Sequence, residues 1–128
     1  MERKVQNQGE LHVYGPENVA ASQTSTELNF TVNAGQAWRV QRIDIEAPPA
    51  CTVELVYTEE TSGNELSLGT FDATDFPLEF KPTSTDNHLV IWEERKLKFE
   101  VKNTTGGQIT ARAKVQYIKV YLDEVRGK

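Results

Sequence analysis

The chain has 128 residues, enough for one domain with a substantial core, and its 14 basic and 19 acidic residues give a net charge of −5. This acidic balance disfavours a nucleic-acid binder, which normally presents a basic face. Cys51 is the single cysteine, so an intramolecular disulfide is excluded and a small buried apolar role is expected for it. We expect one domain over 1–128, with an N-terminal arm at 1–9 and a C-terminal tail at 123–128.

No targeting or membrane signal is expected in this chain. The opening segment, MERKVQNQGE, lacks the apolar region of a secretory signal. No stretch approaches the ~18 consecutive apolar residues of a membrane span, so we expect no membrane partner. The lack of a disulfide favours a reducing compartment, or a particle assembled in one.

In the N-terminal part, apolar residues alternate with polar ones instead of following a helical period. A short strand is predicted over Glu10–Tyr14 and is expected to end at Gly15, which precedes a proline. The polar segment Glu17–Ser25 is predicted to be a loop. A second strand is predicted over Glu27–Val32, with Leu28, Phe30 and Val32 on one face.

A longer strand is predicted over Ala37–Glu46, and its alternation contains a fault. The apolar residues of the two halves have opposite parity: Trp38 and Val40, then Ile43 and Ile45. One extra residue near Gln41 and Arg42 would bring all four onto one face, as a β-bulge does.

Shorter apolar runs follow, separated by turns rich in Gly, Asn and Pro. Strands are predicted over Thr52–Thr58 and over Glu65–Ala73, the second with a kink at Gly69. Pro77 limits the next run to an edge strand or an extended loop, because proline cannot donate to a ladder. The run His88–Glu93 is apolar on both parities, so we expect a strand buried on both faces.

The stretch Lys96–Leu122 contains two alternating runs around a turn at Asn103–Gly107, a pattern typical of a β-hairpin. The second run changes parity after Tyr117, and the apolar residues beyond it point the other way: Ile118, Val120 and Leu122. Either a bulge near Tyr117 returns them to the core, or they are buried against the segment Met1–Val5 or a second subunit. We favour a bulge combined with an oligomer contact.

Together these runs predict an all-β fold. The expected architecture is a single-domain antiparallel β-sandwich, jelly-roll-like, with eight to nine strands spaced roughly ten residues apart.

No catalytic or metal-binding motif stands out. His12 and His88 have no partner at metal-ligand spacing, and no serine lies in a G-x-S-x-G motif. Three loop acids could form a calcium site, although solvated acids are the simpler interpretation: Asp72, Asp75 and Asp86. We expect no cofactor, no metal ion and no enzymatic activity. An enzyme built on a jelly roll is the third and least favoured alternative.

Two segments resemble parts of a known protein class. Asn33–Pro49, NAGQAWRVQRIDIEAPP, resembles a feature of small bacteriophage and virus β-sandwich proteins, in which an AG-x-x-W turn opens a strand. The closing segment, LKFEVKNTTGG followed by ARAKVQY, resembles the last hairpin of jelly-roll-like virion accessory domains. In a strict viral jelly roll the last two strands lie in opposite sheets, and a tight hairpin at Asn103–Gly107 would depart from this. The resemblance implies a decoration protein at the surface of a virion or particle.

The leading hypothesis is a non-enzymatic structural or assembly protein, such as a virion decoration, cement or fibre-head component. It would self-associate, for example as a trimer, on a larger assembly such as a capsid. The predicted interface consists of Ile118, Val120, Leu122, Tyr121 and Trp92. The alternative is a carbohydrate-binding module or adhesin-like domain, in which an exposed aromatic residue would stack on a glycan.

Overall fold

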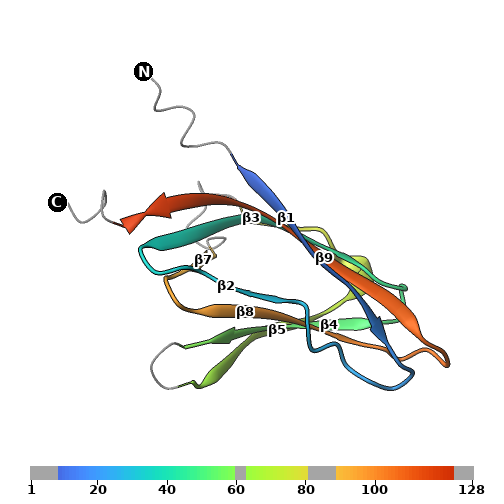
Figure 1. Cartoon of the computed structure of the whole chain (residues 1–128). Helices are drawn as coiled ribbons and strands as arrows, with labels where there is room; N and C mark the ends of the chain where they lie inside the picture. The colour runs from blue at the N-terminus through green and yellow to red at the C-terminus, as the bar shows by residue number, and fades with distance from the viewer. Residues whose placement is uncertain (1–8, 60–62, 81–88, 123–128) are drawn as a thin grey trace.

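A computed structural model describes residues 9–59, 63–80 and 89–122, and in them nine strands form two antiparallel sheets packed together (Figure 1). The first sheet has the order β1-β9-β3-β6, with β7 also paired to β3. The second has the order β2-β8-β4-β5. The predicted all-β sandwich is therefore confirmed. The predicted C-terminal tail lies outside the described residues, as does the N-terminal arm except for Gly9.

The strands of the first sheet are β1 (Glu10–Val19), β9 (Ile109–Tyr121), β3 (Gln36–Glu46), β6 (Leu78–Glu79) and β7 (Val90–Ile91). Those of the second sheet are β2 (Asn29–Thr31), β8 (Lys96–Lys102), β4 (Thr52–Thr58) and β5 (Glu65–Asp72). A short 3-10 helix, η1 (Ala73–Asp75), follows β5.

The last two strands lie in opposite sheets, so the predicted hairpin between them is wrong. β8 pairs with β2 and β4, whereas β9 pairs with β1 and β3. The turn that begins at Asn103 crosses from one sheet to the other. The sequence of a turn does not distinguish a hairpin within one sheet from a connection between two sheets, because both can join two alternating runs. The interleaved strand order is that of a jelly roll.

The β-bulge predicted in the third strand is confirmed. The pairing of β3 with β9 shifts between Val40 and Arg42, opposite the consecutive residues Tyr117 and Gln116. Gln41 is therefore the extra residue. As a result, the apolar residues on both sides of the bulge are all buried: Trp38, Val40, Ile43 and Ile45.

The first strand is longer than predicted. β1 passes through Gly15 and Pro16 and pairs with β9 again from Glu17 to Val19. The register shifts between Tyr14 and Glu17, and Gly15 has a positive φ of 99°. A bulge on an edge strand accommodates a proline, because the backbone N–H that proline lacks is not needed for a hydrogen bond to the neighbouring strand there. The predictions of an end at Gly15 and of a loop starting at Glu17 are therefore wrong.

Three further predictions can be compared with the fold. The kink at Gly69 is confirmed, because the pairing of β4 with β5 shifts there and this glycine has a φ of 134°. The segment after Pro77 forms β6, an edge strand, as predicted. The expectation of a strand buried on both faces near β7 is wrong, since Ile91 is buried but Trp92 is 47% exposed.

An aromatic stack joins the two sheets inside the sandwich. Trp38 of β3 lies parallel to Tyr117 of β9, with ring centroids 3.8 Å apart and an interplanar angle of 9°. On its other side Trp38 stacks against Phe30 of β2 at 4.8 Å. Phe30 in turn lies 6.2 Å from Phe99 of β8. Because these rings come from both sheets, they hold the two layers in register.

Candidate functional site

The predicted interface residues divide into buried and exposed groups. Ile118 and Leu122 are buried within the single chain, and Val120 is half-buried. Trp92 and Tyr121 are each 47% exposed. Burial in one copy accounts for the apolar character of Ile118 and Leu122 without a second subunit, so neither contributes an exposed contact.

The parity change in β9 has a simple geometric cause. No register shift lies in β9 near Tyr117, and the extra residue is in β3 opposite it. Because β9 continues straight, Tyr117 faces the core while Ile118 and Val120 lie on the outer face of the first sheet. The bulge predicted within β9 is therefore wrong. The geometry fits the other alternative, in which the apolar residues after Tyr117 face away from the core. Met1–Val5, the predicted partner segment, lies outside the described residues.

Three exposed apolar residues come from elements near the end of the sandwich where β9 ends and β3 begins, at the left in Figure 1: Trp92 follows β7, Tyr121 ends β9 and Leu66 lies at the start of β5. We call this the end surface and define it by Trp92, Tyr121 and Leu66. Leu66 is 58% exposed, and sequence reasoning did not identify it. Leu66 alternates with polar neighbours as a core residue would, and it lies on the core side of β5. It is exposed because β5 is an edge strand, which the sequence pattern does not reveal.

Hydrogen bonds tie the parts of the end surface together. The Gly35 N–H donates to Oε1 of Glu93 at 2.8 Å, and the Gly35 carbonyl accepts from the N–H of Leu122 at 2.9 Å. These bonds link the loop that carries Trp92 to the end of β9. They fix two exposed aromatic residues on ordered backbone.

A second connection reaches β5 through Tyr57. Tyr57 pairs with Leu66 across β4 and β5, and its hydroxyl is close enough to the Trp92 backbone and to Arg95 for both to influence its pKa. Burial raises the pKa of Tyr57, and the charge of Arg95 is the larger of the influences that oppose the rise. Leu66 is thus connected to the Trp92 loop indirectly, through its strand partner Tyr57.

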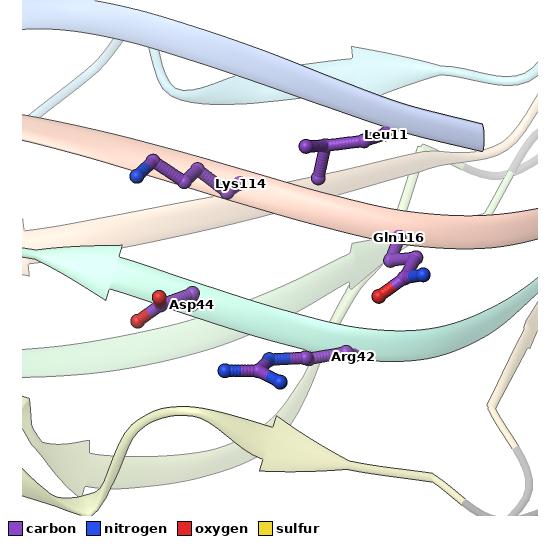
Figure 2. Close-up of a pocket in the computed structure, with 5 residues that line it drawn as sticks. All are labelled: Leu11, Arg42, Asp44, Lys114 and Gln116. Carbon is purple, nitrogen blue, oxygen red and sulfur yellow. The ribbon is translucent and has the colours of Figure 1, made fainter. Parts of the chain in front are cut away.

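The outer face of the first sheet carries a shallow depression of about 210 Å³ (Figure 2). Its lining side chains come from three adjacent strands: Leu11 from β1, Lys114 and Gln116 from β9, and Arg42 and Asp44 from β3. The volume is below the ~300–1,000 Å³ of a typical small-molecule site. A depression of this size and mixed charge suits a surface contact better than a substrate pocket.

Charge pairs lie beside this depression on the same outer face. Glu46 of β3 contacts Lys114 of β9, and its Oε1 lies 3.4 Å from Nη1 of Arg112. Arg42 Nη1 lies 3.8 Å from Oε2 of Glu79 on β6. The hydrogen bond from Lys114 is the largest of the influences that hold the pKa of Glu46 below its ordinary value.

Replacing Lys114 with methionine is expected to raise the pKa of Glu46 toward its ordinary value. A carboxyl whose pKa is lowered by folding stabilises the fold above its unfolded pKa, and this contribution disappears as pH falls through the folded pKa. Wild type and variant should therefore converge in stability at low pH. NMR titration of the Glu46 side chain measures the shift, with Lys102→Met on β8 as a control. An unchanged Glu46 pKa would contradict this assignment.

A cluster of polar side chains around Glu10 lies on the inner face of β1, beside the aromatic stack. The Tyr117 hydroxyl donates to Oε1 of Glu10 at 3.2 Å, and Lys119 Nζ lies 3.6 Å from Oε2 of the same carboxylate. His12 Nε2 lies 3.9 Å from Oε1 of Glu10. Burial is the main cause of a raised pKa for Tyr117 and of the rise to about 12 for Tyr14. These contacts fasten β1 to β9.

The loop acids considered for calcium have a structural role where they are described. Oδ2 of Asp75 accepts a hydrogen bond from the backbone N–H of Asp72 at 2.9 Å and so caps η1. Asp86 and His88 lie outside the described residues. Within residues 9–59, 63–80 and 89–122, no three His, Cys, Asp or Glu side chains gather as metal ligands would. In the same ranges, no helix has the length and apolar character needed to cross a membrane.

No protein-family model matches the chain, and no curated protein is significantly similar to it.

Proposed function

We propose that this chain is a non-enzymatic structural protein that self-associates and is carried on a larger protein assembly. A decoration, cement or fibre-head subunit of a virion is the form that best combines the jelly-roll order with the sequence resemblance. The end surface is the observation that carries this proposal. Exposed Trp and Tyr side chains on ordered backbone are typical of the anchor residues of protein interfaces.

Charged residues on the strands next to the end surface are paired with one another. Glu65 next to Leu66 is paired with Lys98, whose Nζ lies 2.6 Å from Oε2 of Glu65 and 3.4 Å from Oε2 of Glu100. By strand parity these charges face the outer side of the second sheet, whereas Leu66 faces the core side, so the outer face beside the end surface is polar and its charges are paired.

The double substitution Trp92→Ser with Tyr121→Ser is expected to weaken self-association about tenfold or more, because it removes both aromatic anchors. Light scattering over a concentration series gives the mass of wild type and variant. Leu68→Ser, which removes an exposed leucine of β5 outside the end surface, is the matched control and should behave as wild type. A double variant that associates as strongly as wild type would exclude the end surface from assembly.

Glycan binding is the second candidate function, and the same two exposed aromatic residues favour it. An exposed Trp ring can stack on the apolar face of a sugar. A glycan array that responds to the wild type and not to Trp92→Ala would favour this alternative. A wild type that binds no glycan on the array would remove it.

A further inference from the structure

The first half of β1 presents an unpaired sheet edge. Glu10–Tyr14 pairs with β9 on one side, and among the described strands none pairs with its other side. Such an edge exposes alternate N–H and C=O groups and is a template for another strand. Native edges are commonly blocked by proline or a bulge, and here these features begin only at Gly15 and Pro16.

Two exposed apolar residues lie on this edge. Leu11 is 63% exposed and Val13 is 50% exposed, both on the outer face of the sheet. The charged residue of the segment, Glu10, points inward and is already bonded to Tyr117 and paired with Lys119. A strand added at this edge would therefore leave no charge without a partner.

We propose that two copies of the chain pair antiparallel through Glu10–Tyr14 of β1, about a two-fold axis that passes through His12. This inference rests on the proposed function, because it supplies a contact for the self-association proposed there. The paired strands would join the two first sheets into one continuous sheet. The bulge after Tyr14 would end the pairing on each side.

The side-chain pattern selects the register of this pairing. With the axis at His12, Leu11 lies opposite the partner's Val13, and Val13 lies opposite the partner's Leu11. An axis at Leu11 would place Val13 opposite Gly9, and an axis at Val13 would place Leu11 opposite Gly15. Directly opposed apolar pairs are the stabilising unit of an antiparallel sheet. The His12 register is the one of these three that gives both leucines and both valines an apolar partner.

The inner face is complementary in the same register. Glu10 lies opposite the partner's Tyr14, so a carboxylate faces a residue that can donate an O–H. On the outer face the apolar pairs are flanked by Gln116 and Lys114, which pair with Leu11 and Val13 in β9. The contact is thus apolar at its centre and polar at its margin, as interfaces commonly are. A two-fold contact builds dimers, so the trimer expected from the sequence would need another surface.

Disulfide trapping of His12→Cys tests the axis directly. Residues that face each other across an antiparallel pair have Cα atoms about 4.5–5.5 Å apart, within the range that a disulfide spans. His12 is exposed, and Cys51 is fully buried and should not react. Under mild oxidation we expect His12→Cys to form a covalent dimer. Thr110→Cys, an exposed residue of β9, is the matched control and should remain uncrosslinked.

A charge on the edge gives an independent measurement. Val13→Lys should weaken self-association about tenfold, because it places a lysine opposite an apolar residue in the contact. Thr70→Lys, on the exposed edge strand β5, should leave association unchanged. Light scattering gives the mass, and circular dichroism establishes that each variant is folded.

The outcomes separate this inference from the proposed function. Covalent dimers of His12→Cys together with weaker association of Val13→Lys support the β1 contact. An oligomeric wild type with no His12→Cys cross-link and no effect of Val13→Lys overturns the β1 contact and leaves the proposed function standing. A wild type that is monomeric over the whole concentration series overturns both.

Discussion

Replacing Trp38 with alanine is expected to lower the free energy of unfolding by about 3–5 kcal/mol, the range for removing a large buried aromatic side chain. Trp38 is buried between Tyr117 and Phe30, and its ring contacts residues of both sheets. The substitution removes these stacking contacts and leaves a cavity between the layers. Chemical denaturation followed by circular dichroism measures the change.

The second tryptophan provides the matched control. Trp92 is 47% exposed and lies in a loop, so Trp92→Ala should cost less than about 1 kcal/mol. Equal losses for the two variants would contradict the placement of Trp38 in the aromatic stack.

Replacing Asn103 with alanine is expected to lower the free energy of unfolding by about 3 kcal/mol. Asn103 is fully buried, and its Nδ2 donates to the carbonyls of Val19 and Gly107 at 2.9 and 2.8 Å. Its Oδ1 accepts from the backbone N–H and the hydroxyl of Thr105 at 2.9 and 2.7 Å. Alanine would remove these four hydrogen bonds and leave the carbonyl of buried Val19 without this donor. A lost hydrogen bond costs about 0.5–1.5 kcal/mol, and a buried polar group left unpaired costs roughly 1–3 kcal/mol.

A different asparagine controls for the loss of the amide itself. Asn18 lies on β1, where its Oδ1 accepts one exposed hydrogen bond from Thr110 at 3.0 Å. Asn18→Ala should change stability by no more than about 0.5 kcal/mol. An equally small loss of unfolding free energy for Asn103→Ala would contradict the claim that the hydrogen bonds of Asn103 stabilise the connection between β8 and β9.

The sequence predicted what depends on local pattern. The alternation around Gln41 located a bulge, because an extra residue reverses the parity of everything that follows it. The same alternation predicted strands over Thr52–Thr58 and in the first run of Lys96–Leu122, where the structure has β4 and β8. These features follow from the two-residue repeat of a strand.

Strand partners could not be predicted in the same way. The turn at Asn103–Gly107 suggested a hairpin, although β8 and β9 pair with strands distant in the sequence. The parity change after Tyr117 suggested a bulge in β9, whereas the bulge is in the strand that pairs with it. Both errors have one physical cause, since the pairing of a strand is decided by residues outside it.

The surfaces were predicted only in part. Trp92 and Tyr121 are exposed, and Leu11, Val13 and Leu66 are exposed apolar residues that the sequence did not single out. Whether an alternating residue faces the core or the solvent depends on the position of its strand in the sheet. The edge position of β1 and β5 is a property of the topology, and no local pattern encodes it.

The molecular mass of the wild-type chain in solution tests the central claim most directly. One chain has a mass of 14.4 kDa. Light scattering is expected to give a mass that rises with concentration toward a defined multiple of this value, as a self-associating structural protein requires. A mass of 14.4 kDa over the whole concentration series would contradict the assembly function and the β1 contact together.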